Sequence, residues 1–374
     1  WDIGIGGVSG FAVNDYLTWA NLTNYAKGNS STFYQAYSTD TFQVGVSAAN
    51  EMNKSASNNY ISYCFRSIAG YQKISTYTGN SSTSNIIETG FKPAWILIKN
   101  PNTTDGFYIL DDKRKNGTFT NVLYPNLTNA EQTSTGGNGE YSVNFLENGF
   151  ELTEITAGYN QSNNTYLYLA IAGDPDTTTP TVENSFSNIL WSGTGSARSV
   201  TGLGFKPDLI WWKARNANNY NWKAVDSING PTKNLYNNLT NALATDVATT
   251  SFDDDGFTFG NVSGLNYVGY AWKAGDHDDS AAQINTEGNI DSIVSVNDAA
   301  GFSIVKFNGA SGANTVGHGL SQAPELFIMK SANVSGTWGT YVKDLGADKY
   351  LTLNSDTAAT TSTGVWNNTH PTAT

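Results

Sequence analysis

Short runs of apolar residues dominate this chain, and one of them is apolar on both faces. In the stretch "KPDLIWWKA", alternation puts Leu209 and Trp211 on one face of an extended strand. Ile210 and Trp212 then lie on the other face. A strand with two apolar faces is typical of the middle of a sheet that is covered on both sides. The run therefore predicts a buried central strand.

The same run recurs twice, which indicates an internal repeat. "GFKPAWILIKN" begins at Gly90 and "GLSQAPELFIMKS" begins at Gly319, and the prolines of the three copies stand 114 and 117 residues apart. In the two sibling copies, aliphatic residues and a methionine take the places of the tandem tryptophans. Trp211 and Trp212 are therefore predicted to be core residues rather than a sugar-binding platform.

The order of the recurring features divides the chain into units. Complete units are expected at 67–176 and 177–282, with a partial unit (latter part) at 1–66 and another (first part) at 283–374. Runs of roughly five to eight β-prone residues alternate with Gly, Asn, Asp and Ser clusters. The expected fold class is all-β, with tandem antiparallel β-sandwich or barrel-like repeat units of about 110 residues. We interpret the chain as slightly more than one period of a longer three-unit array.

Composition and charge exclude several classes of function. Charged residues make up 14% of the 374 residues and aromatic residues 13%, a mixture typical of β-rich surfaces built from polar, uncharged side chains. The formal net charge of −12 repels phosphate backbones, so nucleic acid is not an expected partner. The sequence shows neither a long apolar run nor a basic-then-apolar leader, so no membrane span and no signal peptide are expected in it.

Few residues offer catalytic or metal-binding chemistry. The single cysteine, Cys64, lies in the apolar run "YISYCF" and is expected to be a buried small residue. Two acidic clusters could bind a hard cation, but their spacing fits no EF-hand loop, so no metal and no cofactor are expected. No pattern places two carboxylates across a groove, so no enzymatic activity is expected either. The candidate ligands of the acidic clusters are Asp253, Asp255, Asp276 and Asp278.

A lysine and an aspartate recur in each unit. The lysine ends the proline-led strand, and the aspartate follows 12 to 14 residues later. That distance suits the partner strand of a hairpin, which predicts a cross-strand Lys–Asp pair in every unit. The lysines are Lys99, Lys213 and Lys330, and the aspartates are Asp111, Asp226 and Asp344.

The recurring stretches resemble a known family. "GFKPDLIWWKARN", "NLTNALATD", "SFDDDGFTFG" and "LNYVGYAWKAGD", followed by "GFSIVKFNGASGANTVGHGLSQAPELFIMK", are similar to the tandem repeats of phage tail-fibre-like virion proteins. The resemblance implies an extracellular virion appendage, a homo-oligomer or filament in contact with other virion proteins. It carries over no catalytic residues. Host surface glycans are a further candidate partner.

Other functions suit the same sequence. A carbohydrate-binding adhesin array would use exposed aromatic side chains, for which Trp19, Trp222 and Trp338 are the stacking candidates. A depolymerase would need the carboxylates at 253–255. A cellular surface filament would suit the repetition and the low charge equally well. In each case, recognition is expected in the loops, where the units differ.

Overall fold

The computed structural model describes residues 15–18, 26–29, 41–44, 58–116, 119–132, 141–155, 158–173, 185–246, 248–260, 263–275 and 284–372. These residues are built from β-strands, and every pairing between two named strands is antiparallel. A 3-10 turn at Lys343–Leu345 is the one helical element among them. The predicted all-β class is therefore confirmed.

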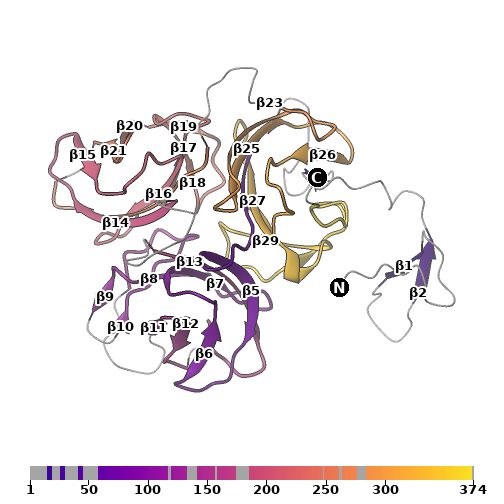
Figure 1. Cartoon of the computed structure of the whole chain (residues 1–374), viewed down its shortest axis with the longest axis horizontal. Coiled ribbons are helices and arrows are strands. Elements are labelled where there is room, and N and C mark those ends of the chain that lie inside the picture. Colours follow the sequence, from indigo (N-terminus) through magenta and orange to yellow (C-terminus); the bar gives the residue numbers. More distant parts are fainter. Residues whose placement is uncertain are drawn as a thin grey trace.

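Three lobes surround a common centre (Figure 1). We call them unit A (described residues from 67 to 173), unit B (185 to 275) and unit C (41–44, 58–66 and 284–372). The larger sheet of unit A has the order β5 (Gln72–Thr78), β13 (Thr165–Ala172), β7 (Pro93–Lys99) and β8 (Phe107–Asp111). That of unit B has the order β14 (Phe186–Ser192), β22 (Asn266–Trp272), β16 (Leu209–Ala214), β17 (Lys223–Asp226), β18 (Lys233–Tyr236) and β19 (Ala244–Thr245).

The larger sheet of unit C contains a strand from the N-terminal part of the chain. Its order is β23 (Ile284–Asn285), β24 (Ser292–Asn297), β25 (Phe302–Asn308), β4 (Asn59–Phe65), β27 (Leu326–Ser331), β28 (Gly339–Val342), β29 (Lys349–Thr352) and β30 (Thr360–Thr361). Tyr63 of β4 lies opposite Ile304 on one side and Ile328 on the other. Strand β4 thus has the place that β13 has in unit A and β22 has in unit B.

A smaller sheet lies on the outer side of each larger one (Figure 1). In units A and B its orders are β11 (Val143–Leu146), β12 (Gly149–Leu152), β6 (Asn85–Glu88) and β15 (Arg198–Thr201), β21 (Gly256–Phe259), β20 (Thr249–Asp253). In unit C, β3 (Thr41–Val44) pairs with β26 (Asn314–Gly317). The other described strands are β1 (Asp15–Thr18), β2 (Ala26–Asn29), β9 (Lys115–Asn116) and β10 (Phe119–Thr120).

The glycine of the recurring Gly-Phe strand is required by a close approach between strands. A Cβ added to Gly149 would lie 2.1 Å from the carbonyl oxygen of Ile87. A Cβ added to Gly256 would lie 1.9 Å from that of Val200. Only a residue without a side chain allows the neighbouring strand to come this near.

The tandem tryptophans of β16 are both buried, and they face opposite sides of the sheet. Trp211 is 1% exposed, and its ring centroid lies 6.5 Å from that of Tyr63 in unit C. Trp212 is 4% exposed, and its ring lies 4.7 Å from that of Phe259 inside unit B. The prediction that these residues belong to the core is confirmed. The face of β16 that carries Trp211 packs at the centre of the molecule, and the face that carries Trp212 packs inside unit B.

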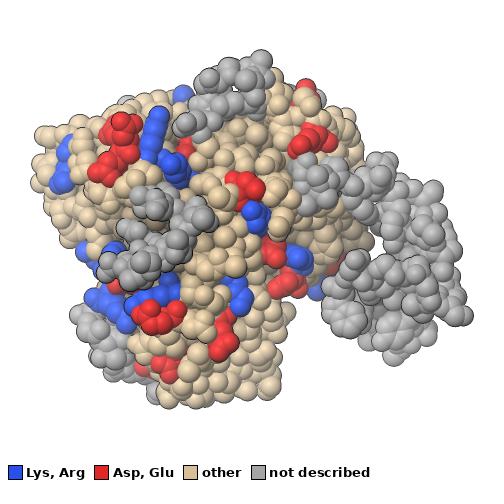
Figure 2. Space-filling view, in the orientation of Figure 1, with Lys and Arg blue, Asp and Glu red and all other residues tan. Residues whose placement is uncertain are grey.

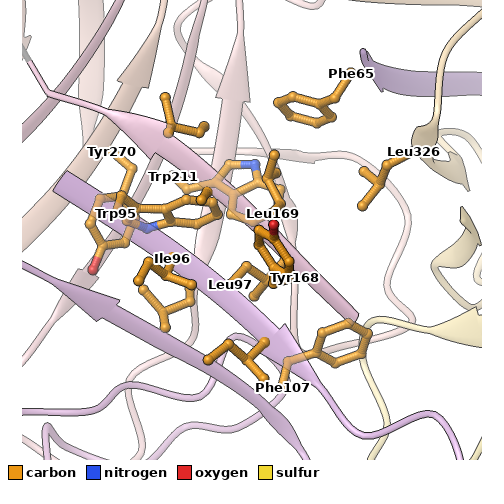
Figure 3. Close-up of a cluster of buried hydrophobic side chains, with 14 of the residues drawn as sticks. Phe65, Trp95, Ile96, Leu97, Phe107, Tyr168, Leu169, Trp211, Tyr270 and Leu326 are labelled. Atoms are coloured by element: carbon orange, nitrogen blue, oxygen red, sulfur yellow. The ribbon is translucent and has the colours of Figure 1, made fainter. Parts of the chain in front are cut away.

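The inner faces of the larger sheets share one hydrophobic cluster at the centre. Figure 3 shows Trp95 and Tyr168 of unit A near Trp211 and Tyr270 of unit B, with Leu326 among the residues drawn from unit C. Trp95 packs at 5.7 Å from Tyr270, measured between ring centroids. Because burial of apolar area is the main favourable term in folding, this shared cluster holds the units together.

A backbone hydrogen bond recurs at all three joints between the units. It runs from Glu131 N to Arg215 O (2.8 Å), from Leu243 N to Ala332 O (2.6 Å) and from Ala359 N to Pro101 O (2.5 Å). These bonds join unit A to B, B to C and C to A. The three units therefore form a closed ring.

Tryptophan side chains reinforce two of the joints. The Nε1 atom of Trp222 donates to the carbonyl oxygen of Tyr124 at 2.8 Å, and that of Trp338 donates to Tyr236 at 2.8 Å. Phe107 has the corresponding position at the joint between units C and A. A cavity of about 20 Å³ lies beside it, lined by residues of both units.

A buried histidine predicts acid sensitivity of unit C. The Nδ1 atom of His318 accepts from Leu320 N at 3.1 Å, so the proton of the neutral ring is on Nε2, 2.9 Å from Thr372 O. Burial lowers the pKa of His318 to about 4. As the pH falls from about 6.5 towards 4, the unfolded chain gains a proton that the folded chain does not, and the free energy of unfolding falls by up to about 3 kcal/mol.

Urea unfolding at pH 7, 5.5 and 4 checks this prediction. The variant His318→Asn keeps an acceptor for the Leu320 N–H but has no group that titrates in this range. We expect its free energy of unfolding to fall less steeply with acid than that of the wild type. Identical slopes for the two proteins would contradict the assignment.

Candidate functional site

Two carboxylates of the first acidic cluster accept hydrogen bonds within the smaller sheet of unit B and from the turn beside it. Asp253 accepts from the hydroxyl groups of Ser251 and Thr258 at 2.7 and 2.9 Å. Asp255 accepts from two backbone N–H groups of the Gly202–Gly204 turn at 3.1 and 2.7 Å. These hydrogen bonds link the strands of the smaller sheet of unit B to one another and to the adjoining turn.

The second acidic cluster, with Asp276 and Asp278, lies outside the described residues. Over the part of the chain that the structure describes, no three His, Cys, Asp or Glu side chains come together as a metal site would require.

Cys64 is the last residue but one of β4 and is fully buried, as predicted. Its Sγ atom is 3.5 Å from Ser62 Oγ. Burial raises the pKa of the thiol to about 12, so the nucleophilic thiolate is not populated near neutral pH.

Two of the three tryptophans named as candidates for sugar stacking are buried. Trp222 and Trp338 have 0% exposure and hold the joints described above, so the prediction that they stack on sugars is wrong. Each of these two tryptophans follows a polar loop and is covered by the neighbouring unit. The sequence around each tryptophan therefore gives no sign of its burial. Trp19 lies outside the described residues.

The predicted Lys–Asp pairs are also wrong. Asp226 lies opposite Leu209, at the start of β16, whereas Lys213 is four residues further along that strand. Four residues of a strand span about 13 Å. Asp111 likewise lies opposite Trp95, and not opposite Lys99.

The recurring lysines instead donate to backbone carbonyl groups. Lys213 Nζ donates to Tyr220 O in its own unit and to Thr128 O in unit A, both at 2.9 Å. Lys330 Nζ donates in the same way to Gly336 O at 2.5 Å and to Thr240 O of unit B at 2.8 Å. Burial lowers the pKa of Lys213 to about 8 and that of Lys330 to about 7. These lysines are therefore part of the joints.

Two of the three recurring aspartates accept hydrogen bonds from tyrosines of the next unit. In unit C, Val342 and not Asp344 has the corresponding place in the sheet, opposite Leu326. Tyr270 of unit B donates to Asp111 of unit A at 2.8 Å, and Tyr63 of unit C donates to Asp226 of unit B at 3.2 Å. Burial raises the pKa of Asp226, although Asn229 and the Tyr63 hydroxyl group partly oppose this shift. Two of the three lysines and two of the three aspartates thus make contacts between units.

A groove at one end of the unit B sandwich is the strongest candidate for a binding site. It has a volume of about 510 Å³. Its lining combines aromatic and polar groups, and the side chains come from β16, β17, β18, β21 and β22 and from the loops beside them. They are Trp212, Asn219, Tyr220, Asn221, Lys223, Tyr236, Asp246, Phe259 and Tyr267.

The charges of the groove neutralise each other. Lys223 Nζ forms an ion pair with Asp246 and lies 4.7 Å from the ring centroid of Trp212. The other carboxylate oxygen of Asp246 accepts from Ala248 N at 2.8 Å. The charges of Lys223 and Asp246 therefore cancel, and this pair gives the groove a polar rim without a net charge.

In unit A, a tyrosine stands at the position that corresponds to Lys223 of the groove. Lys223 pairs across the sheet with Trp212, and the equivalent pair in unit A is Tyr108 with Ile98. The ring of Tyr108 packs against those of three other tyrosines, Tyr124, Tyr141 and Tyr159, at centroid distances of 5.4, 5.5 and 6.1 Å. The groove is thus a feature in which unit B departs from the repeated pattern.

The fold and these contacts define an all-β protein of three joined units. The chain belongs to a family described as a domain of unknown function (DUF7483), whose model matches residues 7–175 and 182–374. No curated protein and no solved structure matches the chain. Within the described residues, none of the helical structure is long and apolar enough to span a membrane.

Proposed function

We propose that the chain is a structural component of a phage virion or phage-like particle, a tail fibre or surface appendage that contributes to host attachment. The observation that supports this role is the use of the repeated residues. The proline-led strands, the recurring lysines, two of the recurring aspartates (Asp111 and Asp226) and the joint tryptophans all make contacts within or between units. A repeat whose recurring residues are devoted to assembly suits a structural building block.

The surface is consistent with a particle component. On the face shown in Figure 2, acidic and basic side chains lie in small groups among a larger area of other residues. On this face, the basic side chains form no broad patch that would attract nucleic acid. We propose other copies of this chain and other particle proteins as partners, outside the cell.

Imaging of particles tests the proposal. Particles from the source culture are purified on a density gradient and examined by mass spectrometry for peptides of this chain. They are then labelled with antibody fragments raised against it and imaged by electron microscopy. We expect peptides in the particle fraction and label on an appendage. Label on cell-surface filaments would favour a cellular filament, and peptides confined to the cell interior would reject both.

A further inference from the structure

The groove of unit B carries an inference that does not depend on a role in particles. We propose that it binds a short, neutral saccharide. The aromatic, polar and charged groups on its walls support this ligand in three independent ways.

One aromatic ring of the groove, that of Tyr220, is exposed enough to stack on a sugar, and the buried rings beneath the groove support it. Trp212, Phe259 and Tyr267 pack on one another at centroid distances of 4.7 to 5.9 Å and are almost completely buried, so they form a rigid floor. Tyr220 is 36% exposed, the most of any ring that lines the groove. The C–H groups on one face of a pyranose ring carry slight positive charge and pack against the negative face of an aromatic ring.

The polar groups suit hydroxyl groups. Asn221 Oδ1 accepts from Asn238 Nδ2 at 2.9 Å, which holds the amide in place. The Nδ2 donor of Asn221 has no partner among the described residues. Asn219 and Tyr236 add further groups that can donate and accept. A sugar hydroxyl group does both, so amide and hydroxyl side chains match it better than a row of like charges would.

Charge and size narrow the class of ligand. The Lys223–Asp246 pair is internally neutral, and the net charge of −12 opposes acidic saccharides, phosphates and nucleic acid. The volume of about 510 Å³ lies within the range of small-molecule sites. A neutral oligosaccharide of a few rings meets both conditions.

Two variants test the groove, and one controls for the surface. Tyr220→Ala removes the exposed ring, and Lys223→Tyr introduces the residue type with which unit A fills this place. Ile86→Ala removes a side chain that is 59% exposed on β6 of unit A, a unit that contributes no residue to the groove lining. The full chain and the variants are applied to an array of neutral and sialylated glycans and titrated by calorimetry with cellotriose, maltotriose and tri-N-acetylchitotriose.

We expect array binding to neutral glycans, a loss of affinity of about fivefold or more for Tyr220→Ala, and no binding for Lys223→Tyr. Ile86→Ala should bind like the wild type, and Tyr220→Ala should keep the wild-type unfolding midpoint. Absence of binding to the array and to all three trisaccharides at 10 mM would overturn the proposal. So would binding to sialylated glycans alone, or unchanged affinity of Tyr220→Ala. None of these results bears on the location of the protein in particles.

Discussion

Replacing Arg114 with methionine should lower the free energy of unfolding by about 3 to 5 kcal/mol. The guanidinium group is fully buried and donates to Asp111 at 2.5 Å and to Glu131 at 3.2 Å. Tyr270 of unit B also donates to Asp111, and Arg215 of unit B pairs with Glu131 at 3.1 Å. Without Arg114, the buried carboxylate of Asp111 loses its cationic partner and Glu131 keeps only Arg215, so the joint between units A and B loses its charge balance.

An exposed ion pair supplies the matched control. Lys92 and Glu147 lie 2.7 Å apart, but their side chains are 55% and 87% exposed. The same change of type, Lys92→Met, should alter the free energy of unfolding by less than about 1 kcal/mol. Urea unfolding followed by circular dichroism measures both variants. Equal effects for Arg114→Met and Lys92→Met would contradict the role given to the buried network.

Replacing Trp222 with alanine should cost about 3 to 5 kcal/mol of unfolding free energy. The side chain is 0% exposed, its ring lies 6.0 Å from that of Tyr270, and its Nε1 atom donates to Tyr124 O in unit A. The change leaves a large cavity at the joint and removes the partner of a buried carbonyl group.

Phenylalanine at this position separates the contribution of ring packing from that of the Nε1 hydrogen bond. Phe107 has the equivalent place in unit A, where its backbone N–H donates to Asn126 at 3.3 Å as that of Trp222 donates to Asn238 at 3.0 Å. The variant Trp222→Phe should therefore cost only about 1 to 2 kcal/mol, chiefly through the lost hydrogen bond. Equal costs for the alanine and phenylalanine variants would show that the ring itself does not stabilise the joint.

Much of the fold could be predicted from the sequence, because burial on two faces leaves a local signature. Trp211 and Trp212 were recognisable as core because sibling stretches place aliphatic residues at the same offsets. The Lys–Asp pairing failed because a spacing in sequence does not determine the register of a hairpin. Lys99 lies opposite Phe107, near the loop, and Asp111 lies at the far end of the strand.

The candidate site was harder to predict than the fold. The groove side chains come from several strands and loops, and Trp212 and Tyr267 also read as ordinary core residues. The burial of Trp222 and Trp338 depends on a neighbouring unit, which the pattern of one unit does not contain. The one signal in the sequence that points to the groove is a difference between units. Lys223 follows Trp222 in unit B, whereas Tyr108 follows Phe107 at the corresponding place in unit A.

The central claim is that β4 lies inside the sheet of unit C, so that the three units close into one ring. In that sheet Ser303 lies directly opposite Cys64, the single cysteine of the chain. Opposite residues of antiparallel strands have Cα atoms about 4.5 to 5.5 Å apart, a range that a disulfide bond can span. The variant Ser303→Cys, refolded under oxidising conditions and digested, should yield one peptide pair that is linked through residues 64 and 303 within a monomer. Free thiols, or a disulfide between two chains, would contradict the closed ring.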